Sequence, residues 1–89
     1  MKIKEGYVIR DLGEEIVVVP TGEEAARFNG VISLNETGRL LFETLQEGAT
    51  KQELIALLQE HYDVSEEQLA QDVEAFLKTL RAHDILLET

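Results

Sequence analysis

Asn29-Gly30-Val31-Ile32-Ser33-Leu34-Asn35-Glu36-Thr37-Gly38 is the stretch of sequence that decides the fold. Its short apolar run, residues 31–34, follows an Asn-Gly pair and stops at Asn35, a residue type that caps helices well. The pattern predicts a strand over 31–34 that leads directly into a helix. Such a strand can offer its open edge to an extended peptide, so this segment is the first candidate for a functional site.

Two more strands are predicted upstream of this segment. Tyr7 to Leu12 is short and partly alternating, Gly13-Glu14 provides a turn, and Glu15 to Pro20 is dense in β-branched residues until Pro20 ends it. Together they indicate a β-hairpin. The connector over 21–28 is expected to hold up to one helical turn.

Three helices are predicted downstream, and each has a start signal. Asn35 caps the first and Gly48 suits its end, while Thr50 with Glu53 and Ser65 with Gln68 match the capping box. Apolar residues at helical spacing give the predicted core faces: Leu41, Phe42 and Leu45, then Leu54, Leu57, Leu58 and Tyr62, then Leu69, Val73, Phe76, Leu77 and Leu80. Gly38 predicts close packing of the first helical turn against the sheet, and the tail 85–87 is expected to return to the core. The order β-β-β-α-α-α is that of an α+β, winged-helix-like fold, with residues 1–89 as one domain.

Composition narrows the function. The 89 residues include no cysteine, which excludes disulfides, thiolate catalysis and Cys-based metal sites. Neither a signal peptide nor a membrane-spanning run is recognised, so a cytoplasmic protein is expected. Eight basic residues against eighteen acidic ones give a net charge of −10, which disfavours nucleic acid and anionic membranes as partners.

No catalytic constellation is recognised in the chain. His61 and His83 stand at or near predicted helix ends, where a cation suits the helix dipole, and neither has a metal-ligand spacing. The paired carboxylates are typical of solvated or capping positions. Ser33 and Ser65 lack the Asp-Ser-Leu setting of an acyl carrier. We therefore expect a non-enzyme without a cofactor.

The sequence resembles the PqqD-like family over nearly its whole length. The residues that carry the resemblance are Val17-Val18-Val19-Pro20, Phe28 to Gly38, Leu41-Phe42 with Leu45, Thr50 to Leu54, Tyr62-Asp63-Val64, Asp72 to Leu80, and Asp84 to Glu88. No single one of these motifs is decisive, but their order and spacing together are specific to the family. Asp84 departs from the pattern, which often has Gly there, so the last turn is expected to differ slightly.

The resemblance implies a three-stranded antiparallel sheet packed on three helices. Members of this family are recognition domains for ribosomally made, post-translationally modified peptides. It implies that the leader segment of a precursor peptide adds a strand to 31–34, is walled by the helix over 66–83, and is delivered to a modifying enzyme, often a radical S-adenosylmethionine (radical SAM) protein.

The predicted peptide-binding residues come from that strand and that helix. They are Val31, Ile32, Ser33, Leu34, Asp72, Val73, Phe76, Thr79 and Leu80. Ile32 and Leu34 are the expected core pair of the strand, and Val73 and Leu80 have the spacing of a buried stripe. Either flank of the helix is compatible with the sequence as the wall of the site: one carries Asp72, Phe76, Thr79 and His83, and the other carries Leu77 and Arg81.

One alternative function stays open at this stage. A winged-helix regulatory or assembly module would bind DNA or another protein, although Lys78 and Arg81 are the only cations on the third predicted helix. The unpaired strand edge is compatible with a monomer or a weak homodimer.

Overall fold

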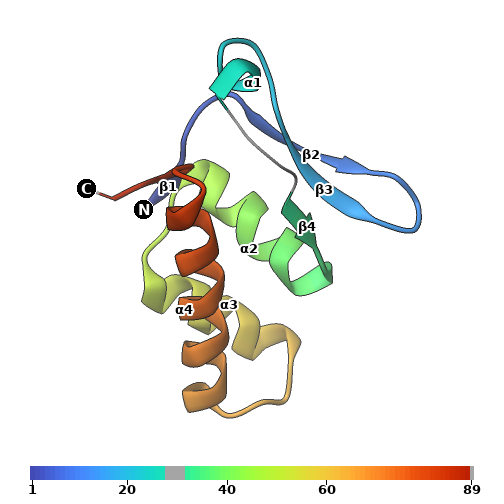
Figure 1. The fold of residues 1–89 in the computed structure, drawn as a ribbon. Helices are drawn as coiled ribbons and strands as arrows, with labels where there is room; N and C mark the ends of the chain where they lie inside the picture. The colour runs from blue at the N-terminus through green and yellow to red at the C-terminus, as the bar shows by residue number, and fades with distance from the viewer. Residues whose placement is uncertain (28–31, 89) are drawn as a thin grey trace.

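The computed structural model describes residues 1–27 and 32–88, and its elements follow the predicted order (Figure 1). Strands β2 (Tyr7–Asp11), β3 (Ile16–Pro20) and β4 (Ile32–Leu34) form an antiparallel sheet in the order β2-β3-β4. Helices α2 (Glu36–Glu47), α3 (Lys51–His61) and α4 (Glu66–Ala82) follow. The predicted α+β class is confirmed, and the connector holds one short helix, α1 (Glu24–Arg27). Val31 lies outside the described residues.

A second, two-stranded sheet was not predicted. Strand β1 (Lys2–Ile3) pairs antiparallel with β5 (Leu86–Leu87), which brings the two ends of the chain together (Figure 1). Ile85 is fully buried and Leu86 is 8% exposed, so the predicted return of the tail to the core is confirmed. Strands of two residues are too short to show an alternating pattern in the sequence.

The helix starts agree with the predicted caps, with one exception. Asn35 Oδ1 accepts a hydrogen bond from the Gly38 N–H at 2.7 Å. Thr50 and Glu53 form both bonds of their capping box, at 3.1 and 3.0 Å. The second box is wrong: Ser65 accepts from the Gln68 N–H, but the Gln68 side chain donates to Asp72 Oδ1 at 3.0 Å instead of returning to the cap.

Most predicted core positions are buried. Leu41, Phe42, Leu45, Leu54, Leu58, Leu69, Val73, Leu77 and Leu80 are at most 3% exposed. Tyr62 corrects the prediction, since it is 37% exposed and its hydroxyl accepts a hydrogen bond from Thr37 at 3.2 Å, while Ile55 is buried on α3 instead. The predicted close packing at Gly38 is confirmed, because a Cβ built there would lie 3.4 Å from the Leu34 side chain.

The end of α4 forms a Schellman motif around Asp84. Asp84 has a left-handed φ of 55°, its N–H donates to the Arg81 carbonyl at 3.0 Å, and the Ile85 N–H donates to the Leu80 carbonyl at 3.2 Å. Glycine is the usual residue at that conformation, so Asp84 holds a backbone shape that its side chain disfavours.

Candidate functional site

The outer edge of β4 is free of strand partners in the described part of the chain, where β3 is its one sheet neighbour. The hydrogen bonds at the two ends of the β2–β3 hairpin show how this edge is oriented. The Leu12 N–H donates to the Glu15 carbonyl at 2.8 Å, and the Thr21 N–H donates to the Gly6 carbonyl at 2.6 Å. In an antiparallel ladder, hydrogen-bonded pairs alternate with non-bonded pairs.

That alternation assigns the backbone groups of β3 and β4. The pair of Val17 with Arg10 lies two residues from the hydrogen-bonded Leu12–Glu15 pair, so it is hydrogen-bonded as well. The N–H and C=O of Val17 therefore face β2. Its neighbours on β3 face β4, where the register pairs Ile16 with Leu34, Val17 with Ser33, and Val18 with Ile32. The N–H and C=O of Ser33 therefore point away from β3, toward the open edge.

The side chains of β4 divide between the core and solvent as expected. Ile32 is 5% exposed and Leu34 is half-buried against the core cluster, which confirms them as the core pair. Ser33 is exposed, and its hydroxyl donates to Glu15 Oε1 at 2.5 Å on the sheet face turned away from the core. The residue whose backbone faces the open edge thus has its side chain bonded to Glu15, the residue just before β3.

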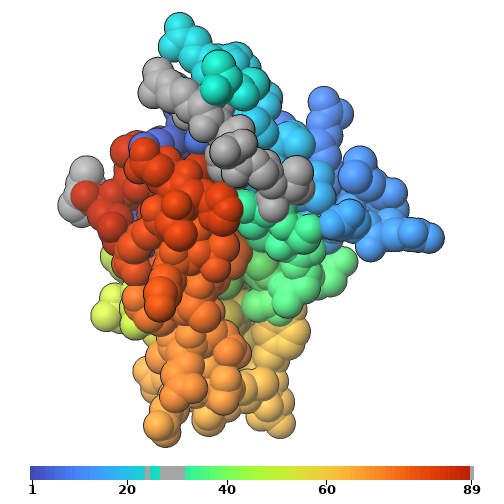
Figure 2. Space-filling model, in the orientation of Figure 1, coloured from blue at the N-terminus to red at the C-terminus, as the bar shows by residue number. Residues whose placement is uncertain are grey.

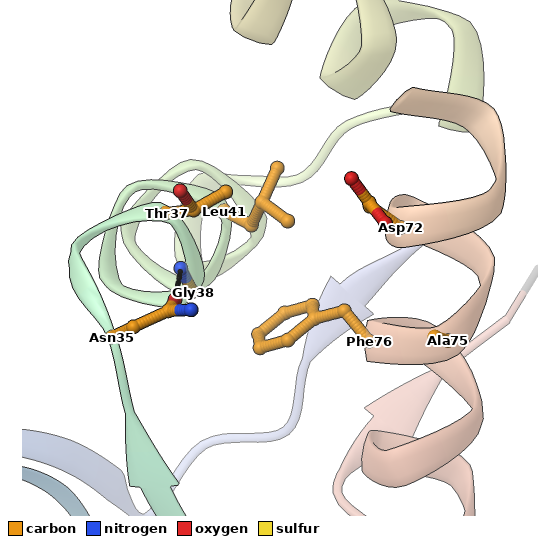
Figure 3. A pocket seen from close by; sticks show the side chains of 7 residues that line it. All are labelled: Asn35, Thr37, Gly38, Leu41, Asp72, Ala75 and Phe76. Atoms are coloured by element: carbon orange, nitrogen blue, oxygen red, sulfur yellow. Dashed lines mark hydrogen bonds between the residues drawn. The ribbon is translucent and has the colours of Figure 1, made fainter. Parts of the chain in front are cut away.

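A pocket of about 350 Å³ lies between α4 and the start of α2, next to the end of β4 (Figure 3). We call it the α2–α4 pocket. It is lined by Asn35, Thr37, Gly38, Leu41, Asp72, Ala75 and Phe76. The Phe76 ring projects from α4 toward the first turn of α2 (Figure 3), and α4 and the start of α2 lie side by side on the face shown in Figure 2.

Most polar groups of this pocket are already engaged by the fold. The Asn35 side chain caps the Gly38 N–H, and the Thr37 hydroxyl donates to the Tyr62 hydroxyl. Asp72 accepts one hydrogen bond from Gln68 and, among the side chains that the structure describes, takes part in no ion pair. The Asp72 carboxylate is therefore the pocket group with most capacity left for a ligand.

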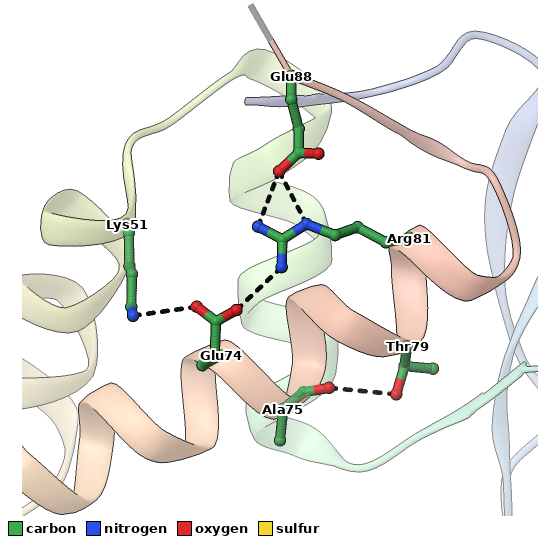
Figure 4. Close-up of polar contacts among 6 residues, drawn as sticks. All are labelled: Lys51, Glu74, Ala75, Thr79, Arg81 and Glu88. Atoms are coloured by element: carbon green, nitrogen blue, oxygen red, sulfur yellow. Dashed lines mark hydrogen bonds and ion pairs between the residues drawn. The ribbon is translucent and has the colours of Figure 1, made fainter.

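The opposite flank of α4 carries a charged network (Figure 4). Glu74 binds Lys51 Nζ at 3.0 Å and Arg81 at 2.9 Å, and Arg81 also binds Glu88 at 2.7 Å. The hydrogen bond from Lys51, followed by that from Arg81, lowers the pKa of Glu74 below its usual value. This network occupies the Leu77 and Arg81 flank, so the flank of Asp72 and Phe76 is the one that faces the pocket.

The predicted site residues fall into two groups. Ser33, Asp72 and Thr79 are exposed and Leu34 and Phe76 are half-buried, whereas Ile32, Val73 and Leu80 are at most 5% exposed and belong to the core. We therefore leave the side chains of Ile32, Val73 and Leu80 out of the proposed contact surface. Val31 lies outside the described residues.

Sequence reasoning missed five pocket residues. Asn35, Thr37, Gly38, Leu41 and Ala75 carried signals only for capping, packing or helix formation, and nothing in the sequence places α4 opposite the first turn of α2. In the described part of the chain, no group of three His, Asp or Glu side chains is placed to hold a metal ion, and no helix is long and apolar enough to cross a membrane.

Comparison with known proteins identifies the family and the fold. The family model described as coenzyme PQQ synthesis protein D (PqqD) matches residues 11–86. The chain belongs to the PqqD family. No curated protein matches this PqqD-family chain.

Two solved structures share its fold. One is described as TbiB1 in complex with the TbiA(beta) leader peptide, with a TM-score of 0.78, 21% identity, and coverage of 100% of this chain and 98% of that one. The other is described as lasso peptide synthetase B1 complexed with the leader peptide, with a TM-score of 0.75, 17% identity, and coverage of 98% and 96%. The PqqD-family chain therefore has the fold of two proteins whose structures hold leader peptides.

Proposed function

We propose that this PqqD-family protein is a non-catalytic adaptor that captures the leader segment of a ribosomally synthesised precursor peptide. The leader adds a strand to the open edge of β4, and α4 walls the site. One observation carries the proposal: the backbone N–H and C=O of Ser33 face an edge of β4 that has no strand partner among the described residues and that ends at the α2–α4 pocket. Strand addition uses main-chain hydrogen bonds for affinity and adjacent pockets for specificity.

The two structural neighbours support a leader as the ligand, since both were solved with leader peptides. The exposed side chains next to the edge also suit an extended peptide better than a small molecule. Thr79 lies further along the pocket flank of α4, and its hydroxyl donates a hydrogen bond to the Ala75 carbonyl at 3.2 Å. The half-buried His83 lies at the end of that flank. A strand laid along β4 would run beside this flank.

The proposed adaptor then presents the bound peptide to a modifying enzyme, which we propose to be a radical SAM protein. The family resemblance supports this partner. The chain has no cysteine for an iron–sulfur cluster, so the cluster chemistry would belong to the enzyme.

Synthetic peptides test the capture step. Overlapping synthetic segments of candidate precursor peptides are titrated into the protein, and binding is followed by fluorescence anisotropy and by amide hydrogen exchange. We expect one segment to bind with a dissociation constant in the micromolar range or below and to slow exchange of the Ser33 amide. Binding that leaves the Ser33 amide unchanged would contradict strand addition at this edge.

Presentation is tested separately. A candidate radical SAM enzyme is assayed on its full precursor peptide with and without the protein, and we expect modification to be faster with the protein present. A Ser33→Pro protein that stimulates modification as well as the wild type would rule out presentation through the β4 edge.

The alternative of a DNA-binding module has less support. On α4, Arg81 is engaged by Glu74 and Glu88, which leaves Lys78 as the one other Lys or Arg of this helix, too few for the several phosphate contacts of a DNA-binding module. A gel shift on random duplex DNA at low salt is expected to show no complex. A stable complex would favour the regulatory module.

A further inference from the structure

We infer that the α2–α4 pocket selects peptides that place a Lys or Arg side chain against Asp72, so that Asp72 determines specificity at one peptide position. This inference rests on the proposed function, because it names the chemistry of one side chain of the bound peptide. It is carried by the composition of the pocket and by the way the chain uses its other charges.

Asp72 is the one charged residue that lines the pocket, and it forms no ion pair with any side chain that the structure describes. Three cations on neighbouring elements or further along α4 are held by other acids: Lys51 and Arg81 by Glu74, and Arg39 by Asp11 and Glu43 (Figure 4 shows the first two). Lys78 is six residues after Asp72, about 120° away around α4, and forms no ion pair with Asp72. The Gln68 amide supplies a single neutral hydrogen bond at 3.0 Å. A carboxylate has room for about four such bonds, so Asp72 retains most of its accepting capacity.

The apolar lining next to Asp72 fits the stem of a long basic side chain. Phe76 lies one helical turn after Asp72 on the same flank of α4, and Leu41 and Ala75 complete the apolar surface (Figure 3). Lys and Arg bury their methylene stems on apolar surface while the charged end stays at its rim. The face of the Phe76 ring adds a favourable site for a cation.

The same arrangement disfavours other side chains. An apolar residue would cover Asp72 without pairing it, and an acidic residue would be repelled by it and by the surplus negative charge of the protein, which totals −10. The pocket, at about 350 Å³, is at the small end of the range for ligand sites and suits one side chain rather than several.

A random peptide library displayed on phage tests this inference. It is selected in parallel on the wild type, Asp72→Asn, Asp72→Lys, Ser33→Pro, and a control, Glu67→Gln. Glu67 is an exposed acid five residues before Asp72, about 140° around α4 at 3.6 residues per turn, so the control makes the same charge change away from the pocket. Asp72→Asn can keep the hydrogen bond to Gln68, and thermal melts establish that each variant is folded.

We expect wild-type and Glu67→Gln binders to be enriched in Lys or Arg at one fixed position. The enrichment should disappear with Asp72→Asn and change to Asp or Glu with Asp72→Lys. For one enriched peptide, Asp72→Asn should weaken binding about three- to twentyfold, while the same peptide with Met in place of the cation should bind the wild type and Asp72→Asn equally. Raising salt from about 50 to about 500 mM should weaken the wild-type and Glu67→Gln complexes more than the Asp72→Asn complex.

The outcomes separate this inference from the proposed function. Binders that need the Ser33 edge but show no basic position would overturn the role of Asp72 and leave peptide capture intact. Failure to enrich any peptide over the Ser33→Pro protein would overturn both.

Discussion

Replacing Ser33 by proline removes the one β4 N–H that faces the open edge. The backbone N–H and C=O of Val17 face β2, so the hydrogen bonds between β3 and β4 are made by Ile32 and Leu34, on either side of Ser33. A proline at 33 therefore removes no hydrogen bond between β3 and β4. Proline also restricts the preceding residue to extended conformations, which Ile32 already has. Ser33→Pro should therefore fold and lose peptide binding.

The magnitude follows from the bonds involved. Stability should fall by about 1 kcal/mol, because the exposed hydrogen bond from Ser33 to Glu15 is lost. Peptide binding should weaken by about 2–4 kcal/mol, because one backbone bond is lost, the peptide carbonyl is left unpaired, and the proline ring crowds the incoming strand. That change corresponds to about 25- to 700-fold in the dissociation constant.

Two controls isolate the backbone effect. Ser33→Ala removes the bond to Glu15 but keeps the N–H, so it should bind peptide like the wild type. Ile32→Pro removes a ladder N–H and a side chain that is 5% exposed, so it should lower the free energy of unfolding by about 3 kcal/mol or more.

The assays are chemical denaturation, anisotropy with a selected peptide, and amide hydrogen exchange of the free protein. In the free protein the Ser33 amide should exchange quickly, and the amides of Ile32 and Leu34 slowly. A protected Ser33 amide without peptide, or Ser33→Pro binding as tightly as Ser33→Ala, would refute the orientation derived for β4.

Three further outcomes are expected. Asp84→Gly should raise the free energy of unfolding by about 0.5–1 kcal/mol in thermal melts, since glycine suits the φ of 55°. A lower melting temperature would show that the aspartate side chain stabilises the fold by more than its left-handed backbone conformation costs. Lys51→Ala should raise the pKa of Glu74 toward its usual value in a carbon-13 NMR titration, and an unchanged titration would contradict the contact. Because the pKa of Glu74 is lowered on folding, its ionised carboxylate stabilises the fold fully above the usual Glu range, and this stabilisation is lost as pH falls through the lowered pKa. Leu80→Ala should cost about 2–5 kcal/mol of stability by opening a cavity, whereas Phe76→Ala should cost less and weaken peptide binding more; equal stability losses with unchanged binding would place Phe76 in the core alone.

Much of the fold was available from the sequence because its signals are local. Capping by Asn35 and Thr50 depends on residues three positions apart, and the stripes of α2 and α4 on a spacing that any helix imposes. These interactions form within one turn, so the sequence alone indicates them. One error was local, because Gln68 donates to Asp72 on the next turn rather than to the cap. The other was not, because the hydroxyl of Tyr62 accepts a hydrogen bond from Thr37, 25 residues earlier in the chain.

The site itself needed the tertiary structure. The sequence by itself determined an apolar strand ahead of a capped helix, and the alternation that makes Ile32 and Leu34 the core pair. Only the three-dimensional register showed that the backbone of Ser33 faces outward, because that depends on which hairpin residues bond across β2 and β3. Only the packing of α4 chose its Asp72 and Phe76 flank over its Arg81 flank, because the way two helices face each other is decided by contacts between residues far apart in the chain.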